Sequence, residues 1–293
     1  AMAALSACAA GGPLPQDAGP NTPARTVREG PALPGTPGAV ITMTAQDGSD
    51  VVASVWGPKK PRAVILALHG FGDYGQLTFR GPAADWTERG IATIAPDQRG
   101  FGRNPSRGRW PGADVLIADA RAYADQVRAR HPCTPLTVLG HSMGGYVISQ
   151  ALETRPDLFS HAIYLTALVP QQRGTPLLVS HASELLVDLL AWSVLNPLTA
   201  CSHFKPSRAA GVLYNRCSET QQQKAIEHLC PQPFRPLLSS VKWSEQRLGS
   251  VPKTYIECAD DNTLPLDLQR KWQTRLSFER IITLDSDHSP FLS

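Results

Sequence analysis

The sequence predicts an α/β fold, in which a doubly wound, mostly parallel sheet carries an inserted helical cap. Short apolar runs alternate with amphipathic helical patterns along most of the chain, which is typical of a parallel sheet covered by helices. The alternation stops between Pro170 and about Ser240 and then resumes, which indicates an insertion between two strands. We therefore expect an α/β core at 39–170 and 241–293 and a cap at 171–240, over the sheet edge where such folds bind ligands.

Eight strands are expected, and the first two form a hairpin. The β-rich runs 40–44 and 51–56 flank Asp47 and Gly48, a pair that favours a turn. The later runs are almost continuously apolar, as strands buried on both faces of a sheet are. They lie at residues 63–68, 91–96, 135–139, 162–166, 254–258 and 280–284.

Helical patterns fill three of the gaps between these strands. Residues 114–131 place apolar side chains on one face and arginines on the other, and shorter patterns cover 146–154 and 266–276. The cap carries an apolar stripe that either packs the cap onto the sheet or lines an acyl or aromatic pocket. This stripe consists of Leu177, Leu178, Leu185, Leu186, Leu189, Leu190 and Trp192.

Residues 1–38 are expected to form a flexible, proline-rich tail. Seven prolines fall between Gly11 and Gly38 with little apolar periodicity, which is linker composition. The segment Leu5–Cys8 resembles a bacterial lipobox, in which the cysteine carries lipid. Two expectations stay open: an exported lipoprotein tethered through Cys8, or a cytoplasmic protein with an alanine-rich tail. No apolar run approaches the roughly twenty residues that a membrane span needs.

Composition excludes several classes of function. Lys plus Arg is 28 and Asp plus Glu is 25, a formal net charge of +3, so no nucleic-acid partner is expected. The six cysteines show no CxxC spacing and no zinc-ligand histidine follows them, so neither a metal nor a cofactor is expected. Cys201, Cys217 and Cys230 are open to two interpretations, a disulfide or small buried side chains.

The segment from Gly140 to Gly145, read GHSMGG, carries the clearest chemical signal. It is a G-x-S-x-G pattern between an expected strand and an expected helix, the context of a nucleophile elbow. Such a turn lifts the Ser142 hydroxyl above the sheet and aims the Met143 amide at a developing oxyanion. His69-Gly70-Phe71-Gly72 follows another buried strand, and there the Phe71 amide is expected to complete the oxyanion hole.

A serine nucleophile needs a base and an acid. His288 follows the last expected strand, and chain order in this kind of site runs serine, acid, histidine. Asp260 and Asp261 both follow the penultimate strand, and we favour Asp261 as the group that holds the imidazole tautomer. Asp97 follows a strand too, but we expect it to hold its loop to Arg99 and to the neighbouring main chain.

Together these motifs resemble the α/β-hydrolase superfamily over roughly residues 40–293. The first half is similar to monoacylglycerol lipases and lysophospholipases, through the segments around Phe71 and Ser142 and through DQRGFG at 97–102. The second half is similar to the plant methylesterase and hydroxynitrile lyase family and its bacterial relatives. The segments that carry this similarity are YLTA at 164–167, YNRCS at 214–218, YIECADD at 255–261, LQR at 268–270 and DHSP at 287–290. That family's pattern implies Asp261 as the catalytic acid.

The sequence departs from the second family at two places. Hydroxynitrile lyases carry a lysine directly after the catalytic histidine, where this chain has Ser289, and this difference favours ester hydrolysis over cyanohydrin cleavage. Family members usually continue past that histidine into a closing helix, whereas Ser293 is the last residue here. We expect that face either to be covered by another segment or to be completed outside this sequence.

The resulting expectation is a serine carboxylesterase with a Ser142, His288 and Asp261 triad. Its substrate is expected to be a small-molecule ester with a small to medium acyl group or an aromatic acid. One alternative is a monoacylglycerol lipase or lysophospholipase activity. An alternative of another class is a ligand-binding, receptor-like homologue with slow turnover, because a fold does not dictate a function. The oligomeric state stays open.

Overall fold

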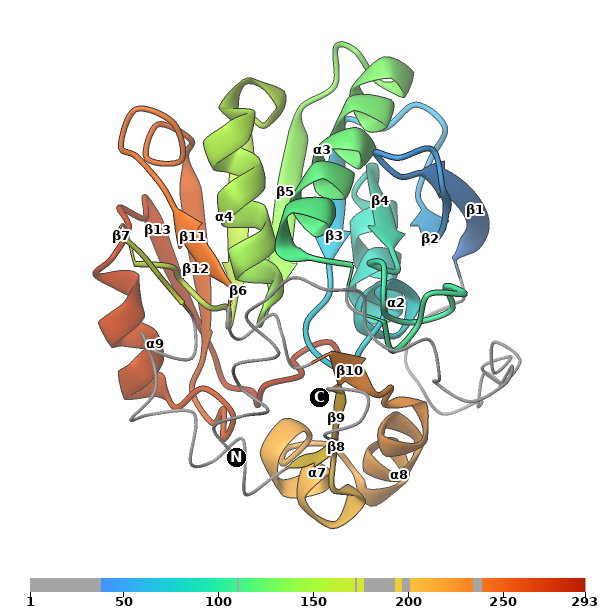
Figure 1. Cartoon of the computed structure of the whole chain (residues 1–293), viewed down its shortest axis with the longest axis vertical. Helices are drawn as coiled ribbons and strands as arrows, with labels where there is room; N and C mark the ends of the chain where they lie inside the picture. Colours follow the sequence, from blue (N-terminus) through green and yellow to red (C-terminus); the bar gives the residue numbers. More distant parts are fainter. Residues whose placement is uncertain are drawn as a thin grey trace.

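A computed structural model describes residues 38–109, 111–171, 173–176, 193–196, 201–233 and 239–292. At its centre lies an eight-stranded sheet in the order β1-β2-β4-β3-β5-β6-β12-β13 (Figure 1). Strand β2 runs antiparallel to both of its neighbours, and every other pair in this sheet is parallel. The predicted mostly parallel sheet is therefore confirmed.

All eight expected strands are present, with ends that differ from the expected ones by up to two residues. They are β1 Ala39–Thr44, β2 Asp50–Trp56, β3 Ala63–Leu68, β4 Ile91–Pro96, β5 Leu136–His141, β6 His161–Leu165, β12 Lys253–Cys258 and β13 Arg280–Leu284.

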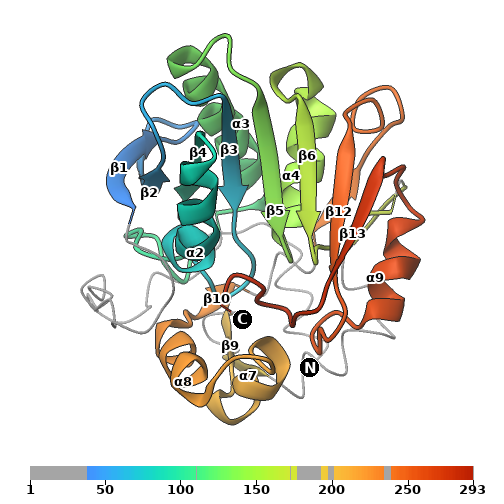
Figure 2. The ribbon, with the colours of Figure 1, turned by 180° about the vertical axis from the view of Figure 1, so that it is seen from behind.

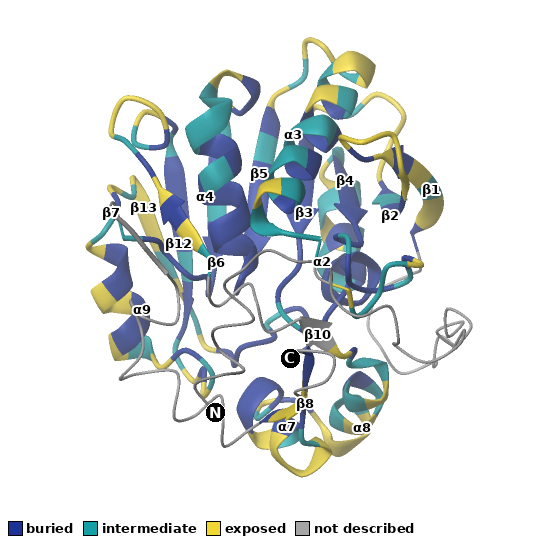
Figure 3. Ribbon diagram, viewed as in Figure 1, coloured by how far each residue is buried: buried dark blue, intermediate teal, exposed yellow. Residues whose placement is uncertain are grey.

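Burial follows the place of each strand in the sheet (Figure 3). The central strand β3 is buried from Val64 to Leu68, which explains its unbroken apolar sequence. The edge strands expose part of theirs: Val40 on β1 is 64% exposed and Ile281 on β13 is 51% exposed. The continuous apolar runs thus mark the inner strands of the sheet, except that the run at 280–284, expected to be buried, forms the partly exposed edge strand β13.

Helices cover both faces of the sheet. Helices α3 (Ala113–Arg130) and α4 (Gly144–Thr154) lie side by side on one face, and α2 (Gly75–Glu88) lies on the other (Figures 1 and 2). A short 3₁₀ turn, Pro156–Leu158, follows α4, and α9 (Leu266–Gln273) packs beside β12. The sequence did not predict α2.

Two features of helix α2 hide the apolar periodicity by which a helix is predicted from sequence. Pro82 lies inside it and cannot donate a main-chain hydrogen bond, so the segment looks like a helix breaker. Its buried face also includes polar side chains, among them Gln76, Thr78 and Arg80, so no clean apolar stripe exists. Tertiary packing against β4 outweighs local propensity here.

The described residues between β6 and β12 form two helices and, unlike the expected cap, several short strands. The two helices and a three-stranded sheet of this segment lie at the carboxyl ends of the central strands (Figure 1). The three-stranded sheet runs in the order β10-β9-β8, and β7 pairs with β11. The bounds are β7 Arg173–Pro176, β8 Ser193–Asn196, β9 Cys201–Phe204, α7 Pro206–Leu213, α8 Glu219–His228, β10 Gln232–Pro233 and β11 Ser240–Lys242.

The core and cap boundaries stay a prediction. The tail at 1–37, with Cys8, lies outside the described residues. So does the apolar stripe at 177–192. Within the described ranges, no helix combines the length and the apolar character that crossing a membrane requires.

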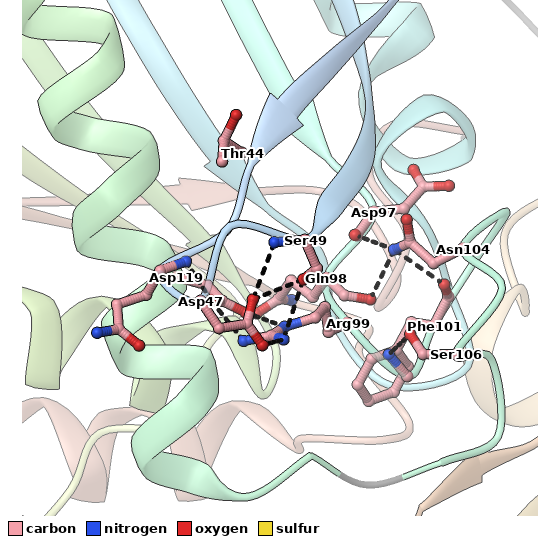
Figure 4. A network of polar contacts seen from close by, with 12 residues as sticks. Thr44, Asp47, Ser49, Asp97, Gln98, Arg99, Phe101, Asn104, Ser106 and Asp119 are labelled. Carbon is pink, nitrogen blue, oxygen red and sulfur yellow. Dashed lines mark hydrogen bonds and ion pairs between the residues drawn. The ribbon is translucent and has the colours of Figure 1, made fainter.

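An ion-pair network fastens the first hairpin to α3 (Figure 4). Arg99 pairs with Asp119 of α3 at 2.6 Å and with Asp47 of the β1–β2 turn at 2.5 Å. Asp97, which we expected to hold its loop to Arg99, instead pairs with Arg103 at 2.8 Å. The expected contact with neighbouring main chain is present, because the Asp97 carboxylate accepts from the Gly75 and Arg103 amides at 3.1 and 2.8 Å. The expected side-chain partner was wrong, because Arg99 turns toward α3 instead.

Candidate active site

Ser142 occupies a strained turn between β5 and α4. Its φ of 51° is left-handed, an unusual conformation for a residue with a side chain. Close packing around the turn requires glycines: a Cβ on Gly140 would lie 2.7 Å from the Gly144 main chain, and one on Gly144 would lie 2.6 Å from the Leu68 oxygen. The G-x-S-x-G pattern thus has the strand, turn and helix context that we expected.

His288 and Asp261 meet at the carboxyl ends of the last two strands. Asp261 follows β12, His288 follows β13, and the His288 Nδ1 lies 2.8 Å from the Asp261 Oδ2. Both residues are 3% exposed. With Nδ1–H donating to the carboxylate, Nε2 is left as the nitrogen that can accept a proton. The histidine next to a serine elbow is therefore oriented as a general base would be.

Main-chain amides fix the carboxylate of Asp261. Its Oδ1 accepts hydrogen bonds from the amides of Thr263 at 2.7 Å and Leu264 at 2.8 Å. Its Oδ2 accepts from the Thr166 hydroxyl as well as from His288. The carboxylate of Asp261 is thus held through both of its oxygens.

The neighbouring aspartates point elsewhere. Asp260 forms an ion pair with Arg216 at 2.5 Å, and its side chain is 46% exposed. Asp287 is fully buried, and its carboxylate accepts from the main-chain amides of Arg216 and Ser289 at 2.8 and 2.9 Å. Of the three, the structure brings Asp261 to the imidazole of His288.

The predicted oxyanion residues flank the serine. Met143 immediately precedes the first turn of α4, where free amides and the helix dipole favour negative charge. Phe71 follows Gly70, whose Cβ, if present, would lie 2.7 Å from the Ser142 Cβ. The loop therefore passes directly against the serine, and only glycine fits there.

His69 holds this loop in place. Its Nε2 accepts from the Gln98 amide at 3.0 Å, which leaves Nδ1–H to donate to the Gly70 oxygen at 2.9 Å. The Gln98 side chain in turn donates to the His69 oxygen at 2.9 Å. Burial lowers the pKa of His69, so the ring stays neutral and keeps this tautomer.

His141, for which the sequence suggested no function beyond the turn, contacts the proposed base. Its Nε2 lies 2.9 Å from the His288 oxygen, and the two ring centroids are 4.9 Å apart. Burial, and then the neighbouring His288, hold the pKa of His141 well below its usual value. His141 therefore stays neutral and can donate to the His288 carbonyl without placing a second charge beside it.

Asp73 is a further buried carboxyl near the site. It follows the Phe71 loop and accepts hydrogen bonds from the Tyr74 amide at 3.0 Å and the Thr78 hydroxyl at 2.7 Å. Burial raises the pKa of Asp73 to about 7, although these hydrogen bonds oppose the rise. Sequence reasoning missed this group, because its burial depends on the unpredicted helix α2.

The cap also contacts the loops that carry the proposed acid and base. Asn215 donates to the Asp260 oxygen at 2.9 Å, and the Thr263 hydroxyl donates to the Val212 oxygen at 2.8 Å. The Cys230 amide donates to the Gly72 oxygen at 2.9 Å, next to the Phe71 loop. Together with the hydrogen bond from the Arg216 amide to Asp287, these contacts join residues 212–230 of the cap to all three loops.

The five cysteines in the described ranges carry free thiols, and four of them are buried. The disulfide interpretation for the segment from Cys201 to Cys230 is not observed, and the alternative of small buried side chains fits these residues. Within the described ranges, no cluster of three or more histidine, cysteine, aspartate or glutamate side chains is arranged to hold a metal ion.

Fold and site together define the class of α/β hydrolases, and comparison with known proteins gives the family. Residues 59–233 match the family described as serine aminopeptidase, S33, and the chain belongs to it. The predicted α/β-hydrolase superfamily is thereby confirmed.

Named relatives are mostly plant methylesterases. A putative chloroplastic methylesterase, number 11, of Arabidopsis thaliana is 29% identical over 238 residues, which cover 78% of this chain and 60% of that protein. The polyneuridine aldehyde esterase of Rauvolfia serpentina is 24% identical over 173 residues, 55% of this chain and 66% of the relative. The chain thus spans about three fifths to two thirds of these relatives' lengths.

Solved structures support the fold. Tomato methylketone synthase I, solved with 2-tridecanone, superposes with a TM-score of 0.68 at 18% identity, covering 79% of this chain and 93% of that one. The chain is therefore an α/β hydrolase whose named relatives include esterases.

Proposed function

We propose that this protein is a serine carboxylesterase that hydrolyses small to medium acyl esters or aromatic carboxylic esters. The observation that carries the proposal is the buried hydrogen bond between His288 and Asp261, beside the strained Ser142 turn. The methylesterase and esterase relatives support the same class of substrate.

The proposed mechanism follows from this arrangement. Ser142 Oγ attacks the ester carbonyl carbon while His288 Nε2 takes the hydroxyl proton, and Asp261 stabilises the imidazolium that forms. The Phe71 and Met143 amides bind the oxyanion. The tetrahedral intermediate expels the alcohol, which receives the proton from His288, and leaves an acyl group on Ser142. Water, deprotonated by the same histidine, then releases the acid and restores the serine.

The experiment compares the wild type with Ser142→Ala on p-nitrophenyl esters from acetate to palmitate, on methyl esters of aromatic acids and on a monoacylglycerol. We expect turnover with an optimum among short acyl or aromatic methyl esters, and a loss in Ser142→Ala of at least about 10³-fold in kcat. Circular dichroism checks that the variant is folded.

The other outcomes separate the alternatives. An optimum at long chains or monoacylglycerol would move the assignment to the lipase-type activity. Undiminished turnover in Ser142→Ala would refute the proposed nucleophile. Ligand binding with negligible turnover of every ester would favour the receptor-like alternative.

A further inference from the structure

Thr166 is one of two strained residues beside the site. Apart from glycines, only Ser142 and Thr166 have a positive φ in the described residues, 51° and 34°. For a β-branched side chain this conformation is a genuine outlier. Such strain persists only where the surroundings hold it, and it is concentrated at functional sites.

The main chain around Thr166 is tied to the serine turn. The Ser142 amide donates to the Leu165 oxygen at 3.2 Å, and the Leu168 amide donates to the Ser142 oxygen at 3.0 Å. On its other side, the Thr166 amide donates to the Ile256 oxygen of β12 at 2.7 Å. The segment from Leu165 to Leu168 therefore bridges the proposed nucleophile and the strand that leads to the proposed acid.

A tyrosine hydroxyl fixes the next residue. The Tyr255 hydroxyl accepts from the Ala167 amide at 3.1 Å and donates to the Ala167 oxygen at 2.9 Å. Both Tyr255 and Ala167 are fully buried. The strained conformation of Thr166 is thus clamped from both sides.

The Thr166 side chain uses this position to reach the acid. It is fully buried, and its hydroxyl donates to Oδ2 of Asp261, the oxygen that also accepts from His288. A hydroxyl that donates to a carboxylate oxygen withdraws part of its negative charge. The hydroxyl thus limits how strongly Asp261 stabilises a protonated His288.

We propose that Thr166 is a positioning residue for the ester hydrolysis proposed above. Its main chain, held on both sides, fixes the position of the Ser142 turn relative to Asp261. Its hydroxyl shares Oδ2 with His288 and thereby weakens the pull of the Asp261 carboxylate on the imidazole. The inference rests on the proposed function for its meaning, but its structural part can be measured without any substrate.

The test follows the protonation of His288 by NMR of the intact protein with labelled histidine, with Ser142→Ala and His288→Gln spectra to assign the signal. Thr166→Val keeps the shape and removes the hydroxyl. We expect the pH of half-protonation of His288 to rise by about 0.5 in Thr166→Val. The acid limb of kcat/KM should move by the same amount. Thr166→Ser, which keeps the hydroxyl, should restore the wild-type midpoint.

Two further variants keep the test decisive. Thr166→Gly suits the left-handed backbone and also lacks the hydroxyl, so it should show the same rise if Thr166→Val does not fold. Thr93→Val is the matched control, because the Thr93 hydroxyl is buried on β4 and has no hydrogen-bond partner in the described part of the chain. It should leave the midpoint unchanged.

The proposal is overturned if the valine and glycine variants show no shift or a downward shift, or if Thr166→Ser shifts as they do. A wild type without turnover on any ester would end the proposed esterase function instead. The NMR titration would still decide whether Thr166 acts on the His288 and Asp261 pair.

Discussion

Two adjacent aspartates follow the same strand, and the fold gives them opposite environments. Asp261 is buried against His288 and two main-chain amides, whereas Asp260 is half exposed beside Arg216. Sequence position narrowed the acid to this pair, because both residues follow β12. Residue chemistry alone does not distinguish the two aspartates as candidate acids, since the direction of each side chain depends on how the loop turns after the strand.

The variants Asp261→Asn and Asp260→Asn test this difference directly. Asp261→Asn cannot hold the Nδ1–H tautomer, so we expect kcat to fall by about 10³-fold or more. Asp260→Asn loses a surface ion pair and should change kcat by less than about threefold. Steady-state kinetics on one p-nitrophenyl ester measures both, and equal losses would contradict the assignment of the acid.

Two further residues at the site, Thr166 and His141, were recognised only from their tertiary contacts. Thr166 was expected to end a strand and to belong to a motif of family resemblance, and His141 was interpreted as part of the glycine turn. Neither residue type signals a function on its own. Their roles depend on contacts with Asp261 and His288, more than 90 residues away in the chain, which no local pattern encodes.

At the scale of elements, apolar runs predicted the central strands well because these strands are buried on both faces. The pattern failed for α2, where Pro82 and polar buried side chains hide the period, and for the short cap strands β8, β9 and β10. Strands of two to four residues carry too few positions for a period of two to be recognised.

One of the links between the α7–α8 segment and the loops that carry Asp261 and His288 is a buried carboxylate. Asp287 accepts from the Arg216 amide of the cap and from the Ser289 amide of its own loop. The Arg216 side chain also reaches Asp260 and Asp285, but those pairs are exposed. The buried link should therefore contribute more to stability than the visible ion pairs.

Urea unfolding of Asp287→Asn and Arg216→Ala tests that order. An asparagine can satisfy only part of the two amide donors, so we expect a loss of about 2 kcal/mol in the free energy of unfolding. Arg216→Ala keeps the main-chain amide and loses only exposed pairs, so about 0.5 kcal/mol is expected. A larger loss in Arg216→Ala than in Asp287→Asn would show that the surface cluster holds the cap.

For the whole molecule, buried titratable groups predict how stability varies with pH. Burial lowers the pKa of His69 and His141 below the ordinary value of 6.5. The unfolded chain therefore binds protons below about pH 6.5 that the folded protein does not. The free energy of unfolding should fall as pH drops below 6.5, by up to about 1.4 kcal/mol per pH unit for each histidine. Asp73, with its pKa raised to about 7, acts in the opposite direction between pH 7 and 4.

Thermal unfolding between pH 8 and pH 5 checks this balance. His141→Gln keeps an amide donor for the His288 oxygen and should lose less stability on acidification than the wild type. Asp73→Asn removes the opposing group and should lose more. Identical pH profiles for the three proteins would contradict the electrostatic account of these buried groups.

If Ser142 is an activated nucleophile, a fluorophosphonate should label it covalently. We predict one label per chain, located on Ser142 by peptide mass spectrometry, with the labelling rate reduced by about 10²-fold or more in Asp261→Asn and nearly unchanged in Asp260→Asn. A label on another residue, or no label on a protein that still hydrolyses esters, would contradict the assignment of Ser142 as the nucleophile.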